Sequence, residues 1–230
     1  MGHAKPLTYP NATEPTGETT MNDFKKIYVF LLILPFLLSA CISLKQPSKK
    51  IAFYTLEYDA PQISGLEPLP VVLAIERFSV APTYNSNQIV YRDHSFKRDA
   101  YTYHKWRNNP GDIATYFLGR DLQQSGLFKA VLSSDSRLPA SHIVEGVVDE
   151  FFEWDLENKW NAVLTISITL TAGDEADRSK KILFQKTYSA KKACKHRNPP
   201  ALAAAMSLAM KEVSRKIIKD IHSHLAVAER

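Results

Sequence analysis

The sequence predicts an α/β fold in which a mixed, largely antiparallel sheet carries two main helices on one face. Strand-like and helix-like periods of apolar residues follow one another along residues 51–230. No internal repeat or low-complexity linker divides that stretch. With 45% hydrophobic and 23% charged residues, the chain has enough apolar material for an ordinary core, which excludes a mainly disordered or multi-span membrane protein. We therefore expect a single domain over residues 51–230.

The first half of this domain is predicted to be mainly strand. Residues 51–58 are rich in aromatic and β-branched side chains, and residues 71–80 follow a proline-containing loop. Residues 88–92 and 100–106 are shorter and predict a hairpin. The spacing of apolar residues then changes to that of a helix.

A helix is predicted to begin after Asn109, which is suited to cap it ahead of Pro110 and Asp112. Gly126 predicts its end. One side of this helix carries Ile113, Ala114, Phe117, Leu118 and Asp121, with Leu122 at its margin.

The second half predicts a strand meander and a long helix. Residues 128–132 and residues 142 to about 154 predict two strands. Residues 162–171 alternate between apolar and polar side chains, which predicts one buried and one wet face. Residues 181–190 predict the next strand, followed by a basic loop over residues 191–200. The apolar side chains from Leu202 to Leu225 recur at helical spacing and predict the last helix.

The amino-terminal part has the features of a lipoprotein signal. Residues 27–38 form an apolar run, broken only by Pro35 and preceded by Lys25 and Lys26. This run is too short for a bilayer, which takes about 20 helical residues, but it has the length of a signal-peptide core. It leads into the four residues Leu38, Ser39, Ala40 and Cys41, which resemble the bacterial lipobox.

The lipobox resemblance implies that Cys41 is acylated and that residues 21–40 are removed as a signal peptide. Three acyl chains make release from a membrane negligible, since each buried methylene contributes about 0.8 kcal/mol. Residues 1–20 are expected to be an upstream extension outside the fold, and residues 41–50 a tether. Ile42 stands where an aspartate would resemble an inner-membrane retention signal, which favours the outer membrane. The alternative is an uncleaved anchor helix, or a buried strand that contains Cys41.

The sequence contains no recognisable catalytic or metal-binding motif. It lacks GxGxxG, GxxxxGK and GxSxG. His222 and His224 are two residues apart on a helix, so we expect solvent-exposed histidines rather than a metal site. Alternation along a strand places Asp149 and Glu153 on one face, which an outward polar surface explains without catalysis. We predict a protein that is not an enzyme and holds no cofactor or metal.

An aromatic cluster in the predicted hairpin is one candidate interface. It consists of Tyr101, Tyr103 and Trp106. A platform for a lipid or a partner would explain it, and so would core or cross-strand pairs.

A basic patch near the last helix is the second candidate. The net charge of +5 is otherwise spread along the chain, so it permits nucleic-acid binding without indicating it. The patch is either a solvated loop or a contact for headgroups or an acidic partner. Cys194 lies inside it and, once Cys41 is acylated, is an unpaired thiol that is shielded or pairs between chains. The members of the patch are Lys191, Lys192, Lys195 and Arg197, with His196 among them.

A series of short motifs follows the lipobox in a definite order. It runs through residues 54–56, 75–84 and 88–92, Tyr101 and Trp106 ahead of Pro110, then residues 122–131 and 150–154. In this order the chain resembles the ABC-type transport auxiliary lipoproteins, a family that includes the PqiC-type lipoproteins.

The family resemblance implies an α/β lipoprotein without enzymatic activity that faces the periplasm. It implies an ABC transporter and an MCE-type substrate-binding protein as partners in moving lipids between the two membranes, with no nucleic acid involved. Only Cys41 carries over as a functional position. A homo-oligomer is possible, but no coiled-coil heptad specifies one. The alternatives are a lipid-anchored envelope hydrolase and a lipoprotein that pilots a secretion pore.

Overall fold

The computed structural model describes residues 25, 28–29, 49–156, 159–173 and 182–228. Residues from Lys49 onward form one compact unit. Its strands are β1 (Ala52–Tyr54), β2 (Leu69–Ile75), β3 (Ser79–Val80), β4 (Gln88–Arg92), β5 (Asp99–Trp106), β6 (Phe128–Leu132), β7 (His142–Leu156), β8 (Lys159–Ala172) and β9 (Ile182–Ala193). Its helices are the short 3-10 turn η2 (Pro82–Tyr84), α2 (Pro110–Gln124) and α4 (Pro199–Ala228).

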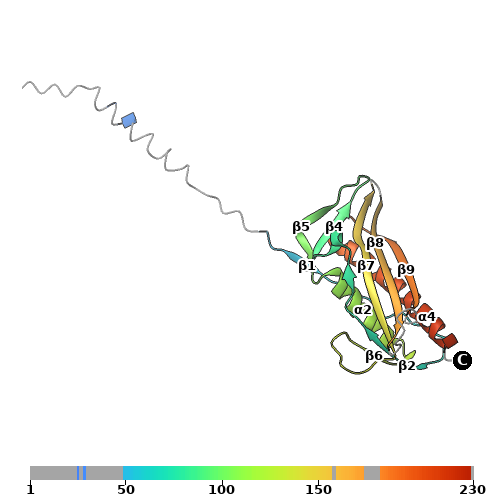
Figure 1. Cartoon of the computed structure of the whole chain (residues 1–230). Coiled ribbons are helices and arrows are strands. Elements are labelled where there is room, and N and C mark those ends of the chain that lie inside the picture. Colours follow the sequence, from blue (N-terminus) through green and yellow to red (C-terminus); the bar gives the residue numbers. More distant parts are fainter. Residues whose placement is uncertain (1–24, 26–27, 30–48, 157–158, 174–181, 229–230) are drawn as a thin grey trace, which may run out of the picture. The chain divides into compact units, whose positions relative to one another are not determined.

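Strand β7 is the central strand of a single mixed sheet (Figure 1). Along one edge it pairs antiparallel with β8, which pairs antiparallel with β9. Along its other edge it pairs, parallel and one after another, with β2, β3 and β4. Strand β6 continues the sheet from β2, while β5 and then β1 continue it from β4.

The α/β class is confirmed, but the expectation of a largely antiparallel sheet needs correction. Of the eight strand pairings in the described residues, five are parallel. Two neighbouring strands that run parallel must be joined by a connection that returns from one end of the sheet to the other. The parallel pairs with β7 come from the first half of the chain, where β2, β3 and β4 run in the same direction as β7. The region predicted as one strand over residues 71–80 contains two of these short strands, β2 and β3.

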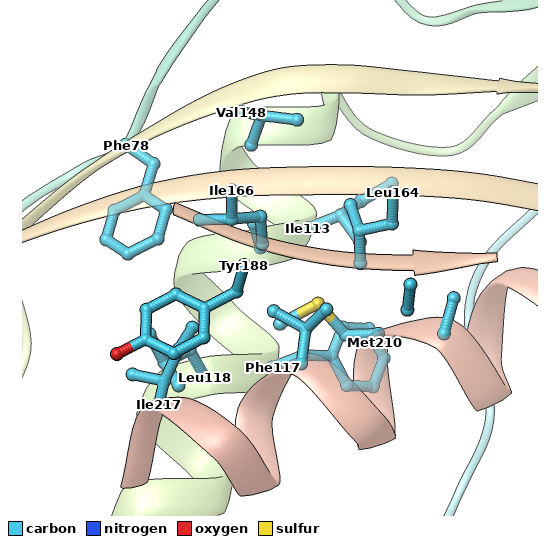
Figure 2. Packing of buried hydrophobic residues seen from close by; sticks show 14 of the residues in the cluster. Phe78, Ile113, Phe117, Leu118, Val148, Leu164, Ile166, Tyr188, Met210 and Ile217 are labelled. Atoms are coloured by element: carbon cyan, nitrogen blue, oxygen red, sulfur yellow. The ribbon is translucent and has the colours of Figure 1, made fainter. Parts of the chain in front are cut away.

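Both helices cover the same face of the sheet, as the sequence predicts. The Asn109 side chain accepts a hydrogen bond from the Gly111 N–H (2.9 Å), so it caps α2 ahead of Pro110. Gly126 ends this helix region with a φ of 66°, a conformation that favours glycine. Helix α4 packs on β8 and β9, and α2 packs beside it on β6 and β7. Figure 2 shows Val148 of β7 and Ile166 of β8 packed toward Leu118 of α2 and Ile217 of α4.

The predicted alternation of β8 is confirmed for its apolar face, but the face predicted to be wet also holds the buried Val163, Thr165 and Thr171. The side chains on its helix-covered face are fully buried, whereas Ser167 and Thr169 lie on the opposite, open face. The buried set is Leu164, Ile166, Ile168 and Leu170.

A β-bulge in β7 reverses which side chains face the helices. The register against β8 shifts between Val148 and Glu150. Before the bulge Val148 points to the core, and after it Phe151 does. Asp149 and Glu153 therefore do not share a face, contrary to the prediction, because simple alternation does not hold across a bulge.

The predicted first strand ends early, at Tyr54 rather than at residue 58. We call residues 55–68 the strap. This segment forms no strand, and its Pro61 and Pro68 have no N–H group to donate to a neighbouring strand. The strap instead runs across both helices and is held by side chains. Its bonds are Glu57 N–H to Ser207 Oγ (2.9 Å), Tyr58 hydroxyl to Asp121 Oδ2 (2.8 Å), and His222 Nε2 to the Glu67 carbonyl oxygen (2.7 Å).

His222 also differs from its predicted environment. The sequence predicts two solvent-exposed histidines on the last helix, but His222 is only 5% exposed because the strap covers it. His224 is exposed, as expected.

Candidate functional site

The predicted lipidation site lies outside the described residues. This holds for Leu38, Ser39, Ala40 and Cys41. Among the residues that are described, no helix is both long and apolar enough to cross a membrane. Nor does any group of three His, Cys, Asp or Glu side chains in this part come together as a metal site. The anchor and the boundaries at residues 20, 40 and 50 stay predictions.

The three aromatic residues of β5 go to three different environments. Trp106 is 1% exposed and meets Phe151 edge-on, with ring centroids 5.1 Å apart. Tyr101 is half-buried, and its hydroxyl donates to Glu153 Oε2 (3.1 Å). Tyr103 is 42% exposed. Of the three, only Tyr103 has the exposure that an interface residue needs.

Tyr103 belongs to an exposed patch at the amino-terminal end of the compact unit. Strand β1 pairs parallel with β5, so Phe53 lies opposite Lys105, on the face that also carries Tyr103. The same register, continued by one residue, places Ile51 beside Tyr103. Ile51 and Phe53 are 46% and 47% exposed. Lys49 lies over the Tyr103 ring, 5.3 Å from its centroid, and Arg107 lies over the Phe53 ring at 5.6 Å. We call Lys49, Ile51, Phe53, Tyr103, Lys105 and Arg107 the β1–β5 patch.

The basic residues predicted as one patch do not share a surface. Strand β9 extends to Ala193, so part of the expected loop is strand, and alternation sends Lys191 and Lys192 to opposite faces. Lys191 lies over the Trp154 ring, 3.9 Å from its centroid, on the open face. Lys192 forms an ion pair with Glu212 of α4.

The two remaining basic residues also separate. Arg197 forms an ion pair with Asp155 and helps to line a groove of about 460 Å³ that includes Tyr91 and Tyr101. Lys195 lines a different groove of about 540 Å³, beside the start of α4. The structure therefore brings Tyr101 and Arg197 together and places the others elsewhere.

The open face of the sheet carries a stack of cations and aromatic rings that sequence reasoning missed. The Arg92 guanidinium lies between Phe152 and Trp154, at 5.3 Å and 4.2 Å from the ring centroids. Lys191 also lies over the Trp154 ring. The ring of Tyr84 stacks on Phe152, at a centroid distance of 5.8 Å. Such cation–π contacts are favourable. Lys191 is exposed, whereas the Nε atom of Arg92 is buried.

A buried carboxyl group lies behind this face, close to the second cysteine. Glu153 is 2% exposed, and burial raises the pKa of its carboxyl group. Burial, with a further contribution from Glu153, raises the pKa of the Cys194 thiol to about 11. Cys194 is partly shielded, and at neutral pH its thiol stays protonated, which makes it a poor nucleophile. This arrangement offers a polar core group and no activated nucleophile.

Comparison with known proteins identifies the family. A family model described as the ABC-type transport auxiliary lipoprotein component matches residues 54–218, from the last residue of β1 into α4. The chain belongs to this family. The resemblance inferred from the order of sequence motifs is thereby confirmed.

Solved structures share the fold of this auxiliary lipoprotein at low sequence identity. Protein XCC0632 from Xanthomonas campestris is 14% identical, with a TM-score of 0.69 over 77% of this chain and 98% of that one. The hypothetical protein CT253 from Chlamydia trachomatis is 11% identical, with a TM-score of 0.50 over 69% and 99% of the two chains. No curated protein sequence matches this chain.

Family membership defines the coarse role of the auxiliary lipoprotein. It associates the chain with an ABC-type transport system and with the bacterial envelope. The matched region includes the strap, α2 and the first two-thirds of α4.

Proposed function

We propose that this auxiliary lipoprotein is a non-enzymatic, lipid-anchored component of an ABC/MCE-type system that moves lipids between the inner and outer membranes. The observation that carries the proposal is the family match over residues 54–218, which follows a lipobox-like sequence ending in Cys41. In this proposal Cys41 is acylated, the signal over residues 21–40 is removed, and the domain faces the periplasm from the outer membrane.

The architecture supports a role in docking rather than catalysis. The helix-covered face is closed by the strap, whereas the opposite face of β7 and β8 carries hydroxyl, carboxylate and cation–aromatic groups that a partner could contact. The partners in this proposal are an MCE-type protein and the ABC transporter subunits. Nucleic acid has no role in it.

Lipidation is tested by mass spectrometry of the protein purified from bacterial envelopes. The expected product begins at Cys41 and carries three acyl chains, and the Cys41→Ser variant lacks them. The matched control is Cys194→Ser, which should be processed normally because Cys194 lies in the folded domain. An intact amino terminus in the unmodified protein would contradict the proposed anchor.

Partnership is tested by cross-linking in intact cells, followed by purification from detergent-solubilised envelopes. We expect the MCE-type protein or ABC subunits to co-purify. Recovery of secretion-pore components instead would favour a pilot lipoprotein. Turnover of ester, glycan or peptide substrates, lost on changing one polar residue, would favour a hydrolase. Either outcome would overturn the proposed function even with Cys41 acylated.

A further inference from the structure

The β1–β5 patch combines exposed apolar surface with positive charge. Ile51, Phe53 and Tyr103 are each more than two-fifths exposed and lie next to one another across the β1–β5 pair. Side chains of this size are usually buried, and an exposed group of them rimmed by polar residues is typical of a protein or membrane contact. Aromatic rings and basic side chains together are the residues that proteins place at the boundary between lipid and water.

The cations of this patch are free of carboxylate partners among the described residues. No ion pair is formed there by Lys49, Lys105 or Arg107. Lys192 and Arg197, by contrast, are each paired with an acidic side chain. The patch therefore presents net positive charge, which complements anionic lipid headgroups.

The position of the patch in the sequence limits its distance from Cys41. Lys49 comes eight residues after Cys41. Eight residues span at most about 28 Å when fully extended. If Cys41 is acylated, the patch is confined to a thin layer next to the membrane. A tether of this length gives a high effective concentration, so even a weak contact with the surface is strongly populated.

We infer that the β1–β5 patch is a membrane-contact surface that rests on anionic phospholipid headgroups beside the lipid anchor. This inference rests on the proposed function, because it uses the acylated Cys41 to bring the patch to the membrane. Contact there orients the domain. The β4–β5–β1 part of the sheet, which pairs with residues 152–154 of β7, faces the membrane. The part around β2 and β6, which pairs with residues 142–144, points away.

Two labelled variants of the full-length gene product, purified as the mature protein in a Cys194→Ser background, measure this orientation. One carries a fluorescent label at Ile51→Cys, inside the patch. The other carries it at Leu138→Cys, which is 68% exposed in the loop between β6 and β7, near the opposite end of β7. The proteins are reconstituted into vesicles of phosphatidylethanolamine and phosphatidylglycerol. We expect iodide in the buffer to quench the Ile51→Cys label at least threefold less than the Leu138→Cys label. Headgroup-bound quenchers should show the reverse order.

A matched pair of double variants separates the patch from the tether. Phe53→Ser with Tyr103→Ser, made in the Ile51→Cys protein, should restore iodide quenching to the level at Leu138. Tyr116→Ser with Val227→Ser removes two exposed apolar side chains elsewhere and should leave the protection intact. Circular dichroism and thermal unfolding of each variant show that it is folded. Replacing phosphatidylglycerol by phosphatidylcholine, or adding 1 M salt, should reduce the protection, because charge contributes to the contact.

Three results would overturn the inference. Equal iodide access at positions 51 and 138 in anionic vesicles would show that the patch stays in water. Protection that does not depend on lipid charge or salt would exclude anionic headgroups as the partner. Protection already present in detergent, without vesicles, would show that a second copy of the chain covers the patch. Mass spectrometry of the same preparations reports acylation of Cys41 separately. An unacylated protein contradicts the proposed anchor, while the two labels on the reconstituted protein still decide whether the patch meets lipid.

Discussion

The two faces of β8 differ in what they contribute to the molecule. On the covered face, Leu164 and Ile166 are fully buried against the helices. On the open face, Ser167 donates to Asp149 Oδ2 (2.6 Å) and lies 2.9 Å from the Thr187 hydroxyl oxygen. The first face removes apolar surface from water, which is the dominant favourable term in folding. The second exchanges hydrogen bonds with water for hydrogen bonds across strands, which gives a much smaller net gain.

This difference assigns separate tasks to the two faces. The covered face and the strap hold the fold, so substitutions there change stability. On the open face, partly exposed polar side chains such as Ser167 and Thr169 can change at little cost to stability. The β1–β5 patch lies at the end of the sheet that extends from β4, on the side opposite to the buried Trp106.

The sharpest test compares neighbouring positions on the two faces of β8. Leu164→Ala should lower the free energy of unfolding by about 3–4 kcal/mol, because it removes a fully buried side chain and leaves a cavity. Ser167→Ala should cost at most about 1 kcal/mol, since it removes a partly exposed hydroxyl group. Urea unfolding followed by circular dichroism measures both. Similar losses in the two variants would show that the faces do not divide the stability in this way.

The strap provides the next largest effect on the covered side. Asp121 is fully buried, accepts from Arg120 Nη2 (2.7 Å) and from the Tyr58 hydroxyl, and so joins α2 to the strap. Asp121→Ala should cost about 2–3 kcal/mol, because it leaves the partly buried guanidinium of Arg120 and the partly buried hydroxyl of Tyr58 without their acceptor. Asp112→Ala is the matched control on the same helix. Its ion pair with Arg77 is largely exposed, so the cost should be at most about 1 kcal/mol.

These two regions also show what the sequence can predict. Alternation along β8 identifies its buried face because one residue step always changes the face. Asn109 and Gly126 mark the ends of α2 because capping is a local interaction. Side chains whose environment depends on near neighbours in the chain are therefore predictable.

Features that depend on distant parts of the chain are not predictable in this way. The strap is held by contacts such as that of Glu57 with Ser207, which are 150 residues apart. The bulge near Asp149 depends on how β7 pairs with β8, and neither glycine nor proline marks it. This bulge turns Glu153 inward. Spacing could have separated Tyr103 from Trp106, because residues three apart on a strand point to opposite faces.

Glu153, on the covered side of β7, makes the stability of the protein depend on pH. Burial raises its pKa in the folded protein above the unfolded value, so the folded state favours the protonated carboxyl group. The cost of this group is absent below about pH 4 and grows as the pH rises through the folded pKa. Glu153→Gln should therefore gain stability relative to the unmodified protein between pH 4 and pH 8. We expect a gain on the order of 1 kcal/mol.

Tyr101→Phe is the complementary variant. The Tyr101 hydroxyl donates to Glu153 and favours its ionised form, so its removal should destabilise the protein more at pH 8 than at pH 4. Thermal unfolding across this pH range measures both variants. If the difference in melting temperature between Glu153→Gln and the unmodified protein were the same at all pH values, the pKa of Glu153 would not be raised.

The smallest expected effects come from Lys191 and Lys192, which are adjacent in sequence and lie on opposite faces. Lys192 and Lys216 lower the pKa of Glu212 to about 2 by donating to its carboxylate. The folded pKa is below the unfolded value, so this contribution is present above about pH 4.5 and is lost as the pH falls toward 2. Lys192→Ala should cost less than about 1 kcal/mol at pH 7, and less still in 1 M salt, because the pair is partly exposed.

Lys191→Ala removes a cation from the Trp154 ring on the open face and should cost about 0.5–1 kcal/mol. This contact involves no carboxylate, so its cost should stay constant between pH 3 and pH 7 while the cost of Lys192→Ala falls. Chemical unfolding at pH 3 and pH 7 distinguishes the two. A cost of Lys191→Ala that fell with pH in the same way as that of Lys192→Ala would show that both lysines act through the same carboxylate, and that the alternation of β9 does not separate their partners.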